Sequence, residues 1–409
     1  MSGRRALAIF AALAFLAAFV FWRIHREAVL DRASASSLGQ QVGVAASSAP
    51  PATLDGATNA ESEATRPAAP AREMIERDPE AAARLWTAHA KTVLRAKNRK
   101  EYGDEVARLM ELPFREGWGP LMQKANDGDL RAAAAAISIS SLCTAEATRG
   151  NVPHGRERPA SSFYKNLPDA MKPFIDRIAE LHTKEYEQRV AGCTGVDKST
   201  DLAYSFIDIL LRPENVEAQI EIAGENKDRA AAVADLRAIL ARQDNARGRL
   251  VLGDVLMGSD DPAEHAEGRA RLEALAFDHP EVANRLGYCL RGDAEGCGNT
   301  APDAAAARSW FEVSAGLGDP AGLSEIGNAL EADGDRAAAW AWSLYGLDLA
   351  LDGCFESFYP SHIHVAGAAR TEAERRAGLT PAEQNAGLAI SYAIEGRWAK
   401  RARERLSCE

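Results

Sequence analysis

Cysteine and histidine give this chain its widest choice of chemistry, since they act as nucleophiles, bases, metal ligands or disulfide partners. The sequence has 6 cysteines and 8 histidines. It has no Cys-x-x-Cys motif, and no cysteine has histidines at zinc-site spacing. An even number of cysteines without such motifs predicts disulfides, which form in oxidising compartments. Alternatively, some thiols are free, buried and inert. The cysteines are Cys143, Cys193, Cys289, Cys297, Cys354 and Cys408.

The remaining polar motifs do not combine into a catalytic or metal site. His362 and His364 share a side only in an extended segment, and no third ligand is near them in sequence. Asn126–Leu130 is too short for a calcium loop and is typical of a turn before a helix. The sequence lacks a Gly-x-Ser-x-Gly motif and a phosphate-binding glycine loop. Cys–His catalysis is open in principle, but nothing singles out a nucleophile, so we expect no enzyme, metal or cofactor.

Composition narrows the class of partner. The chain has 409 residues, 26% of them charged, and a net charge of −11 without a long run of one sign. Such an acidic chain is a poor match for nucleic acid or anionic lipid headgroups. We therefore expect a protein or small-molecule partner and no nucleic acid.

The N-terminus has the composition of a membrane anchor. Ala6–Trp22 is uninterrupted apolar sequence, at the low end of the about 17–25 residues that span a bilayer. Arg23 follows Trp22, and this aromatic–cation pair suits the membrane interface. We expect residues 1–32 to be an uncleaved transmembrane signal-anchor with its flanks. A signal peptide cleaved near Ala33–Ala35, or a segment without a membrane role, are the alternatives.

Residues 33–72 are rich in alanine, serine and proline, which predicts a disordered tether. Arginines flank the apolar run on both sides, so positive-inside counting leaves the orientation open. The predicted disulfides favour an exported chain. We expect a single-pass protein of the inner (cytoplasmic) membrane with its C-terminal region in the periplasm.

From Glu73 onward the pattern predicts helices. Asp78 followed by Pro79 is a helix start, and no segment has the sustained alternation of a strand. We predict an all-α fold in three parts behind the tether. They are an N-terminal helical region with a helix pair (73–199), helix-pair repeats (200–352) and C-terminal capping helices (353–409).

A repeat is visible inside the helical part. Three glycines recur 34 and 40 residues apart, and a leucine follows each of them three residues later. They are Gly253, Gly287 and Gly327, with Leu256, Leu290 and Leu330. In two copies an aspartate then precedes an alanine by four residues and a tryptophan by seven. These sets are Asp303, Ala307, Trp310 and Asp335, Ala339, Trp342.

This pattern resembles the Sel1-like repeat, a relative of the tetratricopeptide repeat. Leu290 and Ala306 replace the tyrosine and lysine of that family's pattern, and the loop is longer and carries Cys297. The resemblance is strong over residues 281–351, fair over 245–277 and poor over 200–242, and it implies an α-solenoid. The matching positions are Leu286, Gly287, Gly292, Asp303, Ala307, Trp310, Phe311 and Ala315.

Packing in such a repeat gives three expectations. Glycine costs about 1 kcal/mol against alanine in a helix, so the recurring glycines indicate close approach of a partner helix with small alanines opposite. Trp310 and Trp342 are predicted to pack between helix pairs rather than line a ligand site. Repeats contact only neighbours, which favours one of 15 disulfide connectivities. It is Cys143–Cys193, Cys289–Cys297 and Cys354–Cys408.

The register also predicts a partner-binding stripe. Polar residues two before and one after each glycine share an exposed face of the stacked first helices. They are Asp254, Arg285, Tyr288, Glu325 and Asn328. An ordinary solvated face is the alternative. The resemblance implies a scaffold or adaptor for another protein, with regulatory roles in envelope, secretion or signalling. Some cysteine-rich relatives are linked to β-lactam binding, so hydrolase or β-lactam-binding activity is the alternative.

Overall fold

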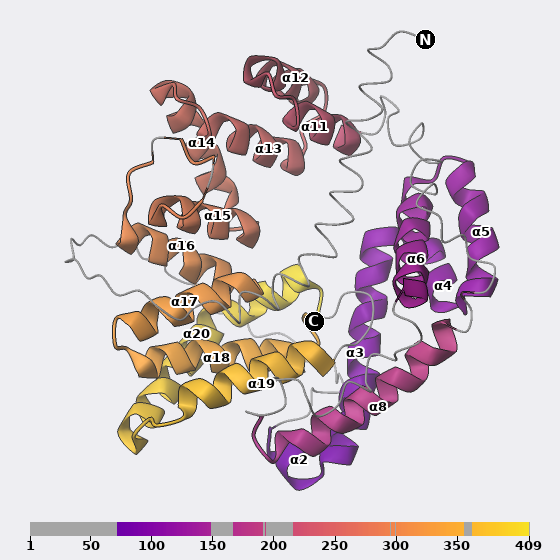
Figure 1. Ribbon diagram of the computed structural model, residues 1–409, viewed down its shortest axis with the longest axis vertical. Coiled ribbons are helices and arrows are strands. Elements are labelled where there is room, and N and C mark those ends of the chain that lie inside the picture. Colours follow the sequence, from indigo (N-terminus) through magenta and orange to yellow (C-terminus); the bar gives the residue numbers. More distant parts are fainter. Residues whose placement is uncertain are drawn as a thin grey trace, which may run out of the picture.

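The computed structural model describes residues 72–148, 167–190, 193, 216–294, 296–298, 300–355 and 362–408, and this part is all-helical, as predicted (Figure 1). The expected anchor (1–32) and nearly all of the tether (33–72) lie outside these ranges. Among the described helices, none combines the length and hydropathy needed to cross a membrane.

The N-terminal region is a group of helices that begins where the sequence predicts. Asp78 caps α3, because its Oδ1 accepts a hydrogen bond of 3.0 Å from the Ala81 N–H, and Pro79 is the first helical residue. The described helices here are α2 (Arg72–Arg77), α3 (Pro79–Tyr102), α4 (Asp104–Glu111), α5 (Phe114–Asn126), α6 (Leu130–Thr148) and α8 (Met171–Val190).

Five helix pairs follow within the described residues, and an aspartate caps the second helix in four of them. Each carboxylate accepts a hydrogen bond from a backbone N–H in the first turn. The caps are Asp228, Asp261, Asp303 and Asp335. The pairs are α11 (Val216–Gly224) with α12 (Arg229–Arg242), α13 (Ala246–Met257) with α14 (Pro262–Leu275), α15 (Pro280–Arg291) with α16 (Ala304–Gly316), α17 (Pro320–Ala332) with α18 (Arg336–Leu351), and α19 (His362–Arg376) with α20 (Pro381–Leu406).

The recurring glycines lie under large side chains, and the expectation of small alanines opposite them is wrong. A Cβ atom at Gly287 would lie 2.5 Å from Cε1 of Phe311 in the paired helix. At Gly327 it would lie 2.0 Å from Nη1 of Arg375, which belongs to the next pair. Close helix–helix approach occurs instead at Gly268, where a Cβ would lie 2.3 Å from the Met257 backbone nitrogen.

Three disulfides join all six cysteines in the connectivity that neighbour pairing favours. Their Cα–Cα distances are 5.6, 5.4 and 5.0 Å for Cys143–Cys193, Cys289–Cys297 and Cys354–Cys408. Cys143 lies inside α6 rather than at its end. Cys289 and Cys297 bracket the end of α15, where Gly292 adopts the left-handed conformation.

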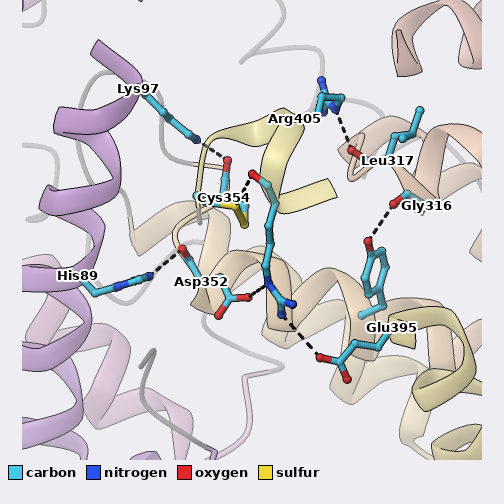
Figure 2. Close-up of a disulfide and its surroundings, with 11 residues drawn as sticks. His89, Lys97, Gly316, Leu317, Asp352, Cys354, Glu395 and Arg405 are labelled. Carbon is cyan, nitrogen blue, oxygen red and sulfur yellow. Dashed lines mark hydrogen bonds and ion pairs between the residues drawn. A yellow bond between two sulfur atoms is a disulfide. The ribbon is translucent and has the colours of Figure 1, made fainter. Parts of the chain in front are cut away.

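The N-terminal region packs against the C-terminal end of the repeat array. One apolar core contains Trp86 of α3, Phe174 of α8, Leu351 of α18 and Val365 of α19. Beside it, two side chains of α3 reach the end of α18: the His89 Nε2–H donates to the Asp352 carbonyl at 3.0 Å, and Lys97 donates to that of Cys354 (Figure 2). Because these carbonyls follow a helix C-terminus, the positive charge of Lys97 suits them.

The C-terminal helix α20 packs against the second helices of the array. A Cβ at Gly316 of α16 would lie 2.3 Å from the indole of Trp398, and one at Gly387 would lie 2.5 Å from the indole of Trp340. Arg401 at the far end of α20 pairs with Asp278 at 2.8 Å, next to α15. This helix therefore runs along the second helices of the array.

Candidate partner-binding face

The predicted stripe residues lie on successive first helices, and hydrogen bonds join them across the helix pairs. Nε of Arg285 on α15 lies 3.1 Å from Oδ1 of Asp254 on α13. The residue one after Gly253 thus meets the residue two before Gly287. The side chain of Asp254 is 47% exposed and that of Arg285 30%, so this ion pair is within reach of solvent.

The next interface repeats the same offsets with different chemistry. The hydroxyl of Tyr288 donates to Oε1 of Glu325 on α17 at 2.9 Å, and Nη1 of Arg291 donates to Oε2 at 2.6 Å. The guanidinium of Arg291 also stacks on the rings of Tyr288 and Phe311, 5.1 and 5.0 Å from their centroids. Burial and, after it, the Glu325 charge raise the pKa of Tyr288, so its hydroxyl remains a donor.

A third interface joins α17 to α19 through a single arginine. Arg375 donates to Oδ1 of Asn328 at 2.9 Å and to Oγ of Ser343 at 2.9 Å, and it approaches Glu331 at 3.3 Å. Its side chain is only 8% exposed, and desolvation lowers its pKa against the opposing charge of Glu331. Gly327 leaves the space that this guanidinium occupies.

We call these three sets of contacts the polar ladder. It contains all five predicted residues together with four that the sequence analysis missed, namely Arg291, Glu331, Ser343 and Arg375. Arg291 and Glu331 stand four residues after Gly287 and Gly327, so extending the stripe by one turn would have found them. Arg375 lies outside the recognisable repeats. The polar ladder joins successive helices, because its side chains form hydrogen bonds and ion pairs with one another.

The other sequence candidates are packing residues or lie outside the described part. Trp342 is 5% exposed, and Trp310 packs on Phe277 with ring centroids 5.7 Å apart. His364 is partly buried beside Phe355, while the side chain of His362 lies outside the described residues. Over the described ranges, no three His, Cys, Asp or Glu side chains form a group that could hold a metal ion.

Comparison with known proteins adds no relative: no family model, no curated protein and no solved structure matches this chain.

Proposed function

We propose that this chain is a membrane-anchored extracytoplasmic scaffold or adaptor that binds another protein through the polar ladder. The observation that carries the proposal is the continuity of the ladder over α13, α15, α17 and α19. Stacked helix pairs bind partners along the face that their first helices share. Tyrosine and arginine, both present in the ladder, are the residue types that dominate interface energetics.

The disulfides support an extracytoplasmic location. All six cysteines are paired, and such bonds persist in oxidising compartments. Residues 1–32 would then be the anchor and residues 33–72 the tether, with the helical part on the periplasmic side of the inner membrane.

The kinship with Sel1-like repeats is part of the proposal. The packing supports it by giving a physical reason for several positions of the repeat pattern. Gly287 accommodates the ring of Phe311, Asp303 caps α16, and Gly292 ends α15 in the left-handed conformation. These are positions at which the resemblance was recognised. A regulatory role in envelope, secretion or signalling is the expectation that this kinship carries.

The test inverts one ion pair without removing it. Because Arg285 and Tyr288 hold neighbouring helices, changing both to alanine would weaken binding and stability together. Asp254→Arg combined with Arg285→Asp preserves the pair and reverses its polarity. We expect the melting temperature to change by no more than about 2 °C and the affinity for the partner to fall by about 2 kcal/mol.

Photo-crosslinking in native membranes identifies the partner, and the crosslinking yield measures its binding. A photoreactive residue at Ser324, exposed on α17 beside Glu325, should capture it, and the inverted pair should reduce that yield. The control position is Tyr392, whose side chain is 70% exposed. It lies on α20, and this helix packs against the second helices of the array. Equal capture from both positions, or a yield unaffected by the inversion, would place binding elsewhere.

A further inference from the structure

The loop between α15 and α16 lies against the preceding helix pair. A Cβ atom at Gly298 would lie 2.8 Å from the carbonyl oxygen of Met257 and 2.9 Å from that of Ser259, so the loop backbone touches the turn between α13 and α14. In that turn, a Cβ at Gly258 would lie 3.2 Å from the carbonyl oxygen of Gly296 in the loop. Backbone therefore packs on backbone here, and glycines leave the space that this contact needs.

The same loop borders one residue of the polar ladder. A Cβ at Gly296 would lie 3.1 Å from Nη2 of Arg285, and Nε of Arg285 lies 3.1 Å from Oδ1 of Asp254. Gly296 has a φ of 73°, a conformation that glycine adopts without strain. The loop thus contacts the guanidinium on α15 and also the turn after α13, the helix that carries Asp254. It touches both sides of this ion pair.

The Cys289–Cys297 disulfide ties the loop to α15. Cys297 stands between Gly296 and Gly298, the two residues that make these contacts, and Cys289 lies in α15. The bond closes only 8 residues, whereas the other two disulfides close 50 and 54. In the chain-entropy model it therefore constrains the unfolded chain least of the three. Its position in the loop gives it a second effect, on where the loop lies in the folded protein.

We infer that the α15–α16 loop, pinned by the Cys289–Cys297 disulfide, is a positioning element of the polar ladder. It holds the end of α13 against α15, so that Arg285 and Asp254 meet at the observed distance. The contacts stand by themselves, whereas their consequence for partner binding rests on the proposed function.

An apolar core also joins the two helix pairs. Met257 and Leu272 of the first pair cluster with Val282 and Leu286 of the second. Loosening the loop should therefore leave the pairs assembled, and its effect should be confined to the end of α13.

The test is hydrogen exchange in the full chain at the end of α13. The backbone N–H groups of Gly258 and Ser259 donate within the last turn of this helix, at 3.1 and 3.0 Å. In Cys289→Ser combined with Cys297→Ser we expect them to exchange on the order of tenfold faster, because a lost contact worth about one hydrogen bond shifts a local opening equilibrium by that factor. Amides of α17 and α18 should keep their rates.

Gly298→Ala separates the loop contact from the covalent bond. It leaves the disulfide in place, but its Cβ would meet the carbonyl oxygens of the α13–α14 turn. Gly334→Ala is the matched control, because Gly334 also has a positive φ, 81°, and a Cβ there would have nothing within 4 Å. Gly298→Ala should speed exchange at Gly258 and Ser259, and Gly334→Ala should not. Unchanged exchange there in Gly298→Ala or in the disulfide variant, or an equal increase in all helices, would overturn the inference.

Partner capture from Ser324 gives the second readout. We expect the disulfide variant and Gly298→Ala to lower the crosslinking yield, and Gly334→Ala to leave it unchanged. No capture from Ser324 in the unchanged chain would contradict the proposed function alone, because the exchange rates are measured without a partner. Faster exchange at the end of α13 with an undiminished yield would show that the loop positions α13 but not the surface that the partner contacts, which would also overturn the inference.

Discussion

Gly287 lies under the ring of Phe311, and the packing leaves no space for a methyl group. A Cβ there would lie 2.5, 2.7 and 2.9 Å from three carbons of that ring. We expect Gly287→Ala to lower the free energy of unfolding by about 1–2 kcal/mol, because overpacking outweighs the gain in helix propensity. Chemical denaturation measures the change.

Gly396 is the matched control for this prediction. It lies in the interior of α20, and a Cβ there would have nothing within 4 Å. Gly396→Ala should therefore raise the free energy of unfolding by about 1 kcal/mol, through helix propensity alone. Substitutions that shift stability in the same direction would show that the glycine of α15 is not sterically required.

His364 makes the junction between the N-terminal helices and the array sensitive to acid. Burial, and after it the nearby Lys97 of α3, lowers the pKa of this imidazole. The unfolded chain therefore binds a proton at a higher pH than the folded one, and stability falls as pH drops below the ordinary histidine value of about 6.5. The slope from one such proton is at most about 1.4 kcal/mol per pH unit.

His364→Gln isolates this contribution. The free energy of unfolding of the unchanged protein, minus that of the variant, should decrease between pH 7.5 and 5.5. A difference that stays constant over this range would mean that the pKa of His364 is the same in the folded and the unfolded chain. Only the difference between the two proteins isolates the contribution of His364.

At the scale of single elements, the sequence predicted where helices start. It did not predict which side chains pack at each contact between helices. The start at Asp78–Pro79 and the caps at Asp303 and Asp335 are local, since each carboxylate accepts a hydrogen bond from the backbone N–H three residues on. What lies over a glycine depends on a distant segment. Arg375 is 48 residues from Gly327 in sequence (375 minus 327) and belongs to a helix without the repeat pattern, so no local signal announced it.

The Cys354–Cys408 disulfide ties the end of α18 to the end of α20. Its sequence separation of 54 residues corresponds to about 4 kcal/mol in the chain-entropy model. We expect Cys354→Ser combined with Cys408→Ser to lower the free energy of unfolding by up to this amount and to increase hydrogen exchange in the last turns of α20. The Cys289–Cys297 disulfide closes a loop of only 8 residues, so Cys289→Ser combined with Cys297→Ser should cost less.

At the scale of the whole molecule, the sequence predicted the all-helical class, but not the contacts between distant helices. His89 and Asp352 are 263 residues apart, and their hydrogen bond is one of several that dock α3 on the end of α18. Neither residue belongs to a recognisable motif. Similarly, the polar ladder followed from a repeat offset, whereas its last connection, to α19, needed the three-dimensional arrangement.

Removal of residues 1–71 tests the independence of the helical part. The core around Trp86 and Phe174 begins with α2 and α3, after these residues. We expect the shortened chain to be soluble, with a helical circular dichroism spectrum and all three disulfides found by mass mapping without reduction. Aggregation, or six free thiols, would contradict the domain boundary and the oxidising compartment respectively.

The docking of the N-terminal helices on α18 and α19 also determines how the molecule would carry a mechanical load. Residue 72 begins α2, whose Ile75 lies in the core shared with α18 and α19 (Figure 1). Tension applied at that residue enters the array at its C-terminal pairs and passes through a packed core. The pairs α11–α12 and α13–α14 lie outside this path, so a pull at residue 72 would not load them directly.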